Sequence, residues 1–97
     1  MSKQFPVITI CGSMRYFQEM RKAAESYTAQ GYIVLMPFVT VATNTRDLII
    51  QKEMLDRMHI EKIDMADSIL VIGSHRGEST KREIAYAELM NKPVITG

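Results

Sequence analysis

The sequence is poor in several features, and each shortage argues against a class of protein. It has one cysteine, Cys11, so an intramolecular disulfide cannot form. No apolar run approaches the roughly 18 to 20 residues that a membrane-spanning helix needs, and the N-terminus lacks the features of a signal peptide. The formal net charge is only +1, which leaves no basic stripe for a phosphate backbone. These shortages predict a cytoplasmic protein that contacts neither a membrane nor polymeric nucleic acid.

What is present is typical of one small folded domain. Of the 97 residues, 46% are hydrophobic and 24% are charged, close to the averages for globular domains. This length permits one hydrophobic core, so we expect a single domain over residues 1–97. Eight methionines are more than average, and we expect most of them to fill the core or a subunit contact.

Strand and helix signals alternate along the chain. Apolar, β-branched runs predict strands at 7–10, 32–36, 68–72 and 94–96. Helical spacing of apolar residues predicts helices at 16–30, 47–66 and 79–90, with Gly31 after the first and with Asp47 and Ser79 as the N-caps of the others. The Thr-rich stretch 39–46 is expected to be a loop that acts either as a lid or as an interface segment.

This alternation predicts an α/β fold with a parallel sheet. We expect a Rossmann- or flavodoxin-like three-layer sandwich whose sheet has four or five strands, in the order 2-1-3-4. Ligands of such sheets bind beyond the carboxyl ends of the strands, at the point where the strand order reverses. Here that point lies between the first and third strands, where segments 12–15 and 74–80 should meet.

The first of these segments has the composition of an anion-binding turn. Gly12 permits close backbone approach, and Ser13 offers a hydroxyl and an amide just before a helix. Arg15 can supply a countercharge. The other interpretation is an ordinary strand-to-helix turn with Ser13 as its N-cap.

Glu83 is predicted in the first turn of the third helix, where the helix dipole and nearby amides should keep it ionised. An ionised carboxylate at a strand-end cleft can act as a nucleophile or stabilise an oxocarbenium-like centre. The alternative is a helix-capping glutamate that interacts with Arg82 or Arg76 and has no other role.

His59 falls on the inward side of the second helix, beside Leu55 and Ile63. Both a satisfied core histidine and a catalytic acid or base fit that position. No other His or Cys stands at ligand spacing from it, so no metal site is predicted.

Three blocks resemble the nucleoside 2-deoxyribosyltransferase-like superfamily, and within it the 2'-deoxynucleoside 5'-phosphate N-hydrolases. Residues 10–15 (ICGSMR) resemble its first strand and phosphate-side turn. Residues 64–71 (DMADSILV) resemble the start of its third strand. Residues 77–87 (GESTKREIAYA), followed by 92–94 (KPV), resemble its "G.s...E.gyA...gKpv" segment.

The resemblance implies cleavage or transfer at the N-glycosidic bond of a nucleoside or its 5'-monophosphate, with Glu83 as the nucleophile and no cofactor. It also implies a homodimer or higher homo-oligomer, because members often complete their pockets with a neighbouring subunit. The substrate-binding residues would be Gly12, Ser13, Met14, Arg15, Gly77, Ser79 and Thr80.

Two positions depart from the family pattern. Thr9 stands where the family usually has a Tyr, and His59 stands where it usually has an Asp, eight residues before Asp67. His59 can replace that acid in proton transfer, or it can mark a chain that has lost hydrolysis. The alternative to an enzyme is therefore a non-catalytic nucleotide-binding or nucleotide-sensing module on the same fold.

Overall fold

Four parallel strands form one sheet in the order β2-β1-β3-β4, as the sequence predicts. The structure is a computed structural model that describes residues 4–38 and 45–97. The strands are β1 (Val7–Gly12), β2 (Ile33–Leu35), β3 (Ser68–Ile72) and β4 (Val94–Thr96). A 3₁₀ turn, η1 (Met14–Tyr16), leads into α1 (Phe17–Ala29), and α2 (Thr45–Met65) and α3 (Glu78–Leu89) complete the chain.

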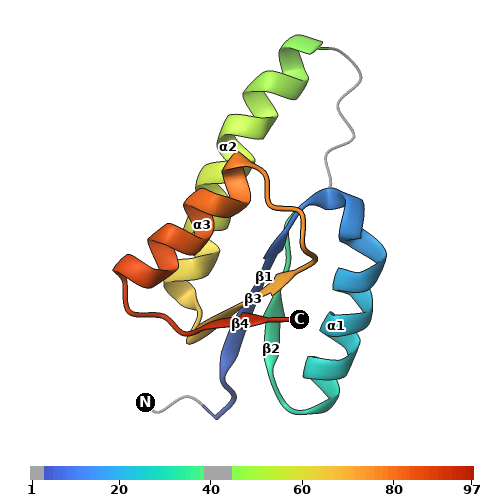
Figure 1. Ribbon diagram of the computed structural model, residues 1–97, viewed down its shortest axis with the longest axis vertical. Helices are drawn as coiled ribbons and strands as arrows, with labels where there is room; N and C mark the ends of the chain where they lie inside the picture. The colour runs from blue at the N-terminus through green and yellow to red at the C-terminus, as the bar shows by residue number, and fades with distance from the viewer. Residues whose placement is uncertain (1–3, 39–44) are drawn as a thin grey trace.

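The helices cover both faces of the sheet, which confirms the α/β prediction (Figure 1). Helix α1 lies on one face, and α2 and α3 lie side by side on the other. The central strands are buried on both sides, as parallel sheets require. One core cluster faces α1 and the other faces α2 and α3; they consist of Ile8, Ile10, Met20, Leu70 and Ile72, and of Cys11, Ile63, Ile69, Val71 and Ala87.

Alternation along β1 decides which side chains reach the site. Ile8 and Ile10 point to the α1 face, so Thr9 and Cys11 point to the α2 and α3 face. Thr9 is fully buried and donates its hydroxyl proton to the carbonyl of Lys62 at 2.8 Å. Cys11 lies two residues closer to the carboxyl end of the strand and faces the functional residues described below.

Residues from two of the segments that resemble a known family, 64–71 and 92–94, make structural contacts at the amino ends of the strands. Asp67 accepts a hydrogen bond from the amide of Val7 and donates its own amide to the carbonyl of Val7, both at 2.8 Å. Lys92 donates to the carbonyls of Asp64 and Ala66 at the end of α2. These contacts hold β3 against β1 and α2 and do not involve a ligand.

Helix starts differ from the sequence prediction. Helix α2 begins at Thr45, so Asp47 lies inside its first turn and the prediction of Asp47 as the N-cap is wrong. Helix α3 begins at Glu78 with Gly77 in the cap position, so Ser79 is its second residue and not its cap. A Gly N-cap is nearly as favourable as Ser, and it shifts the start without a side-chain signal. Most of the stretch 39–46 lies outside the described residues.

The helix ends agree better with the sequence. Helix α1 ends at Ala29, and Gly31 follows with a positive φ of 95°, the conformation that Gly adopts at little cost after a helix. Helix α2 runs without interruption to Met65. Within the described ranges, none of the helices combines the length and apolar character that a membrane span needs.

Candidate functional site

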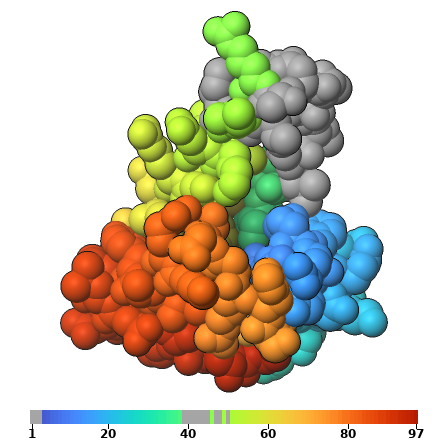
Figure 2. All heavy atoms as spheres, turned by 45° about the horizontal axis from the view of Figure 1, so that its top comes forward, coloured from blue at the N-terminus to red at the C-terminus, as the bar shows by residue number. Residues whose placement is uncertain are grey.

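A cavity of about 540 Å³ opens at the carboxyl ends of the strands, between α2, α3 and the segment after β1. In the space-filling view the yellow-green, orange and blue parts of the chain meet around this region (Figure 2). Its lining residues come from all of these elements and from the segment after β2: Gly12, Met14, Pro37, Phe38, Lys52, Leu55, Asp56, His59, Ser79, Thr80 and Glu83. The cavity therefore lies where doubly wound sheets bind ligands.

The structure brings together six of the nine predicted site residues. Gly12, Met14, His59, Ser79, Thr80 and Glu83 line the cavity. Ser13, Arg15 and Gly77 do not line it in the described structure. Ser13 instead caps the short turn η1, where its hydroxyl accepts a long hydrogen bond of 3.4 Å from the amide of Arg15.

Tyr16, the residue directly after the predicted segment 12–15, contacts the second predicted segment, 74–80. The hydroxyl of Tyr16 accepts a hydrogen bond of 3.1 Å from the backbone amide of His75. Gly12 lies beside β3 with φ at +149°, and a Cβ atom there would stand 2.7 Å from the carbonyl oxygen of Ile72. Gly12 is therefore required for the close approach of β1 and β3 and not only for access to a ligand.

Glu83 and His59 form a buried pair in the wall of the cavity. The Oε1 atom of Glu83 lies 3.6 Å from Nε2 of His59, and the two residues are only 8% and 5% exposed. Glu83 lies on the second turn of α3, because that helix begins at Glu78. It lies beyond the first turn and points inward to His59, so the alternative of a helix-capping glutamate is wrong, although Arg82 is close enough to lower its pKa slightly.

Burial controls the charges of this pair. It raises the pKa of Glu83 to about 7, with repulsion from Asp56 adding to the effect. The prediction that the α3 dipole keeps Glu83 ionised is therefore wrong in direction, because the helix N-terminus is more than one turn away and desolvation dominates. Burial and the nearby positive charge of Lys62 lower the pKa of His59 to about 4, so its imidazole is neutral at pH 7.

Cys11 is the third member of this cluster. Its Sγ atom lies 3.5 Å from Nε2 of His59, and the side chain is fully buried. Burial, with the nearby Glu83 carboxyl, raises the pKa of the thiol far above its ordinary range. The Sγ, Nε2 and carboxylate oxygen atoms all lie within 4.8 Å of one another. Sequence spacing missed this group because it joins β1, α2 and α3.

Four charged or polar side chains contact one another at the rim of the same cavity. The ammonium group of Lys52 contacts a carboxylate oxygen of Asp56 at 3.2 Å and the hydroxyl oxygen of Ser79 at 3.3 Å. Arg82 donates to the same hydroxyl oxygen at 3.3 Å and lies 3.9 Å from Asp56. Lys52 and Asp56 precede His59 by seven and three residues, so the helical period of α2 could have identified them from the sequence. Lys52, Asp56 and Ser79 line the cavity and offer a cation, a carboxylate and a hydroxyl to a polar ligand, whereas Arg82 contacts Ser79 and Asp56 without lining the cavity itself.

Solved structures with the same arrangement support the fold. A 2-deoxyribosyltransferase from Bacillus psychrosaccharolyticus superposes with a TM-score of 0.72 at 17% identity, over 93% of this chain and 70% of that one. A conserved protein from Enterococcus faecalis superposes with a TM-score of 0.57 at 14% identity, over 95% of this chain and 62% of that one. No protein-family model and no curated protein matches the sequence. The chain therefore has the nucleoside deoxyribosyltransferase-like fold.

Proposed function

We propose that this protein cleaves or transfers at the N-glycosidic bond of a (deoxy)nucleoside or its 5'-monophosphate, with Glu83 as the nucleophile. The observation that carries the proposal is the Glu83 carboxyl, which is buried in the wall of a 540 Å³ cavity at 3.6 Å from His59. A cavity of this size accommodates a small molecule. The similar structure of a 2-deoxyribosyltransferase supports this choice of substrate class.

The reaction needs an ionised carboxylate, which Glu83 supplies in part at neutral pH. Its oxygen attacks the anomeric carbon as the bond from that carbon to the base nitrogen breaks, and the electron pair stays with the base, which takes a proton from water. Water or a second base then attacks the same carbon, and the bond to Glu83 breaks. The imidazole of His59 is neutral at pH 7 and so cannot act as the acid, and its low pKa also makes it a weak base; the proton of the attacking water therefore passes mainly to solvent.

The rim residues fit a polar sugar or its 5'-phosphate. Lys52 and Arg82 both reach the hydroxyl of Ser79 near the start of α3. Phosphate oxygens bind well where cations and helix amides meet. Asp56 in the same group is an acceptor for sugar hydroxyls.

One observation favours the alternative, a nucleotide-binding module without turnover. Thr9 stands where the family usually has a Tyr, and its hydroxyl is used by the carbonyl of Lys62 in the core. Among the described residues, the cluster around Glu83 therefore contains a thiol and an imidazole but no phenol, and the catalytic proton transfers depend on His59 and water. Binding without product release would support this alternative.

The test is chromatography of reaction mixtures. The protein is incubated with a panel of deoxyribonucleosides and their 5'-monophosphates, with and without a free acceptor base. Release of base from one substrate indicates hydrolysis, and exchange only with acceptor indicates transfer. Glu83→Gln should reduce turnover by about 10³-fold or more, the scale seen when a nucleophile is removed.

The matched control is Glu88→Gln, which changes an exposed glutamate on the same helix. It should leave turnover within about twofold of the unmodified protein, since surface substitutions rarely alter a distant site. Full turnover in Glu83→Gln would overturn the assignment of the nucleophile.

A further inference from the structure

Cys11, His59 and Glu83 form a set of metal-ligand types that the proposed reaction does not need. They come from β1, α2 and α3 and present a sulfur, a nitrogen and a carboxylate oxygen within 4.8 Å of one another. All three are buried, at 0%, 5% and 8% exposure. Buried polar groups in native proteins are usually satisfied by close hydrogen bonds.

The contact between His59 and Glu83 is long for a hydrogen bond, whereas the contact between His59 and Cys11 has an ordinary length for a hydrogen bond to sulfur. The His59 Nε2 atom lies 3.6 Å from the Glu83 carboxylate and 3.5 Å from the Cys11 sulfur. An N–H···O bond normally measures about 2.7 to 3.2 Å. The Nε2 atom of His59 therefore lies next to a thiol and a carboxyl group without a close bond to the carboxyl oxygen.

The same distances suit a shared cation. A tetrahedral zinc ion, with bonds of about 2.3 Å to sulfur and 2.0 Å to nitrogen, separates those two ligand atoms by about 3.5 Å. Two nitrogen or oxygen ligands of such an ion lie about 3.3 Å apart. The measured 3.5 Å and 3.6 Å agree with these separations to within a few tenths of an ångström.

We propose that Cys11, His59 and Glu83 bind a zinc-type divalent cation through Sγ, Nε2 and a carboxylate oxygen, with the fourth position open to the cavity. Zinc accepts this mixture of sulfur, nitrogen and oxygen donors, and three protein ligands leave one position for water or a ligand. His59 and Glu83 line the cavity, so the open position faces it.

Charge balance also favours a divalent cation. A thiolate and a carboxylate together carry two negative charges, which one divalent ion neutralises inside a low-dielectric wall. On binding, the Cys11 thiol and any protonated Glu83 carboxyl each release a proton to solvent, and no electrons are transferred. The ion occupies the carboxylate that the proposed nucleophilic attack needs, so zinc should inhibit that reaction and a chelator should restore it.

The test is titration of the metal-free protein with Co²⁺, a spectroscopic substitute for zinc. We expect one ion per chain, with intense visible bands of tetrahedral cobalt and a near-ultraviolet thiolate-to-cobalt band. Added Zn²⁺ should remove both features by displacement. Weak visible bands without the thiolate band would contradict the proposal, because they would indicate an ion bound at surface carboxylates.

Substitutions of the proposed ligands test which side chains bind the ion. Cys11→Ser and His59→Gln should each weaken Co²⁺ binding by more than the roughly 10- to 100-fold that loss of an outer-shell partner costs. His75→Gln is the matched control, because His75 is the other histidine and lies exposed in the loop before α3. Unchanged binding in Cys11→Ser or His59→Gln would overturn the site.

Cys11 and His59 belong to the core, so circular dichroism first establishes that each variant folds. If either does not fold, Glu83→Gln replaces it in the same titration, and unchanged binding there would equally overturn the site. The spectroscopic result needs no substrate. A protein that binds cobalt without releasing base would contradict only the proposed function, and an active protein without the cobalt bands would contradict only the metal site.

Discussion

Glu83 holds a carboxyl group in a place that disfavours its charge. The side chain is 8% exposed, and burial raises its pKa to about 7. Groups around it come from each adjoining element: the Cys11 thiol from β1, His59 and Asp56 from α2, and Arg82 from α3. When it is ionised, such a buried group lowers the stability of the fold, and functional sites often contain groups that lower stability in this way.

This cost gives a pH-dependent stability difference between the unmodified protein and Glu83→Gln. Between the unfolded pKa of 4.5 and the folded value of about 7, the unfolded carboxyl loses its proton first, so the unmodified protein loses stability as pH rises. We expect Glu83→Gln to be more stable at pH 8 by up to about 3 kcal/mol and nearly equal at pH 4.5. Urea unfolding with a chelator present measures both.

The lowered pKa of His59 acts in the opposite direction, because a histidine that stays neutral in the fold loses stability as pH falls from 6.5 towards 4. The unmodified protein and Glu83→Gln share this contribution of His59, so it largely cancels in the difference between their stabilities. A Glu83→Gln variant less stable than the unmodified protein at pH 8 would show that the carboxylate is stabilised in the fold.

At the scale of elements, two glycines near the site have different roles. Gly12 at the end of β1 has a positive φ and would place a Cβ atom 2.7 Å from the backbone of β3. Gly77, the N-cap of α3, has φ of −76° and nothing within 4 Å of an added Cβ atom. The first glycine is required by the packing of two strands, whereas the second is not.

We therefore expect Gly12→Ala to lower the free energy of unfolding by about 2 kcal/mol or more, because a strained φ and a backbone overlap combine. Gly77→Ala should lower it by only about 0.5 to 1 kcal/mol, the loss of a favourable N-cap residue without any steric overlap. Chemical denaturation of both variants provides the comparison. A larger loss in Gly77→Ala than in Gly12→Ala would contradict the assignment of Gly12 to strand packing.

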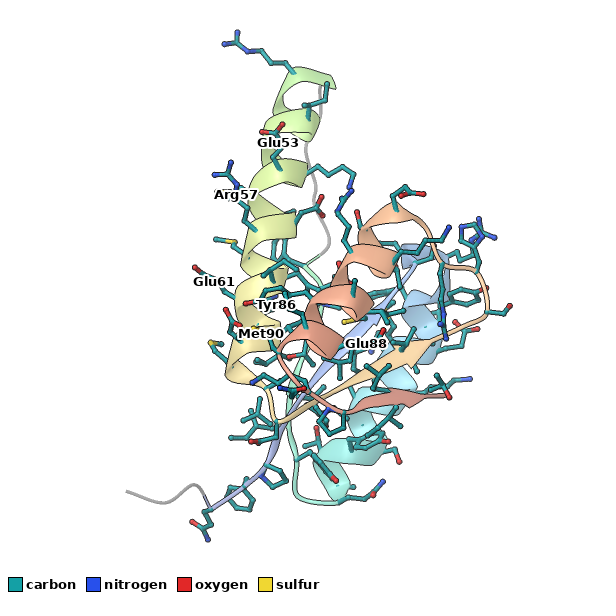
Figure 3. The ribbon with its side chains drawn as sticks, turned by 60° about the vertical axis from the view of Figure 1, so that its left-hand side comes forward. Glu53, Arg57, Glu61, Tyr86, Glu88 and Met90 are labelled. Atoms are coloured by element: carbon teal, nitrogen blue, oxygen red, sulfur yellow. The ribbon has the colours of Figure 1, made fainter. Side chains whose placement is uncertain are left out.

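At the scale of the whole molecule, the exposed side of α2 carries a row of charged side chains and, next to it, a row of methionines. Glu53, Arg57 and Glu61 follow one another along its outer side (Figure 3). Beside them, the exposed Met54, Met58 and Met65 lie within about 40° of one another around the helix axis. Exposed apolar groups that gather on one side of a helix often mark a protein contact.

The formation of a homo-oligomer remains a prediction. The exposed methionines Met54, Met58 and Met65 of α2 are the surface where we expect two subunits to contact each other. We expect light scattering after size exclusion to give a mass above that of one chain, and Met58→Glu to raise the concentration needed for assembly at least tenfold. Lys81→Glu on α3 is the control. A monomer at all concentrations would contradict the prediction.

The sequence alone determined the layers of this protein, because hydrophobic period and turn chemistry are local signals. Alternating strands and helices predicted the parallel sheet and its order, and Gly31 predicted the end of α1. The resemblance of residues 77–87 also pointed to Glu83, which the structure places in the cavity wall. The periodicity of α2 placed His59 on its inward face.

Only the tertiary structure decided the chemistry of the site. Cys11, His59 and Glu83 are separated by 48 and 24 positions in the sequence, and their meeting depends on how α2 and α3 pack over β1. Burial then raised the pKa of Glu83, where the sequence had predicted a carboxylate held ionised, and kept His59 neutral. Desolvation depends on the atoms that surround a group in space, and no local pattern along the chain contains that information.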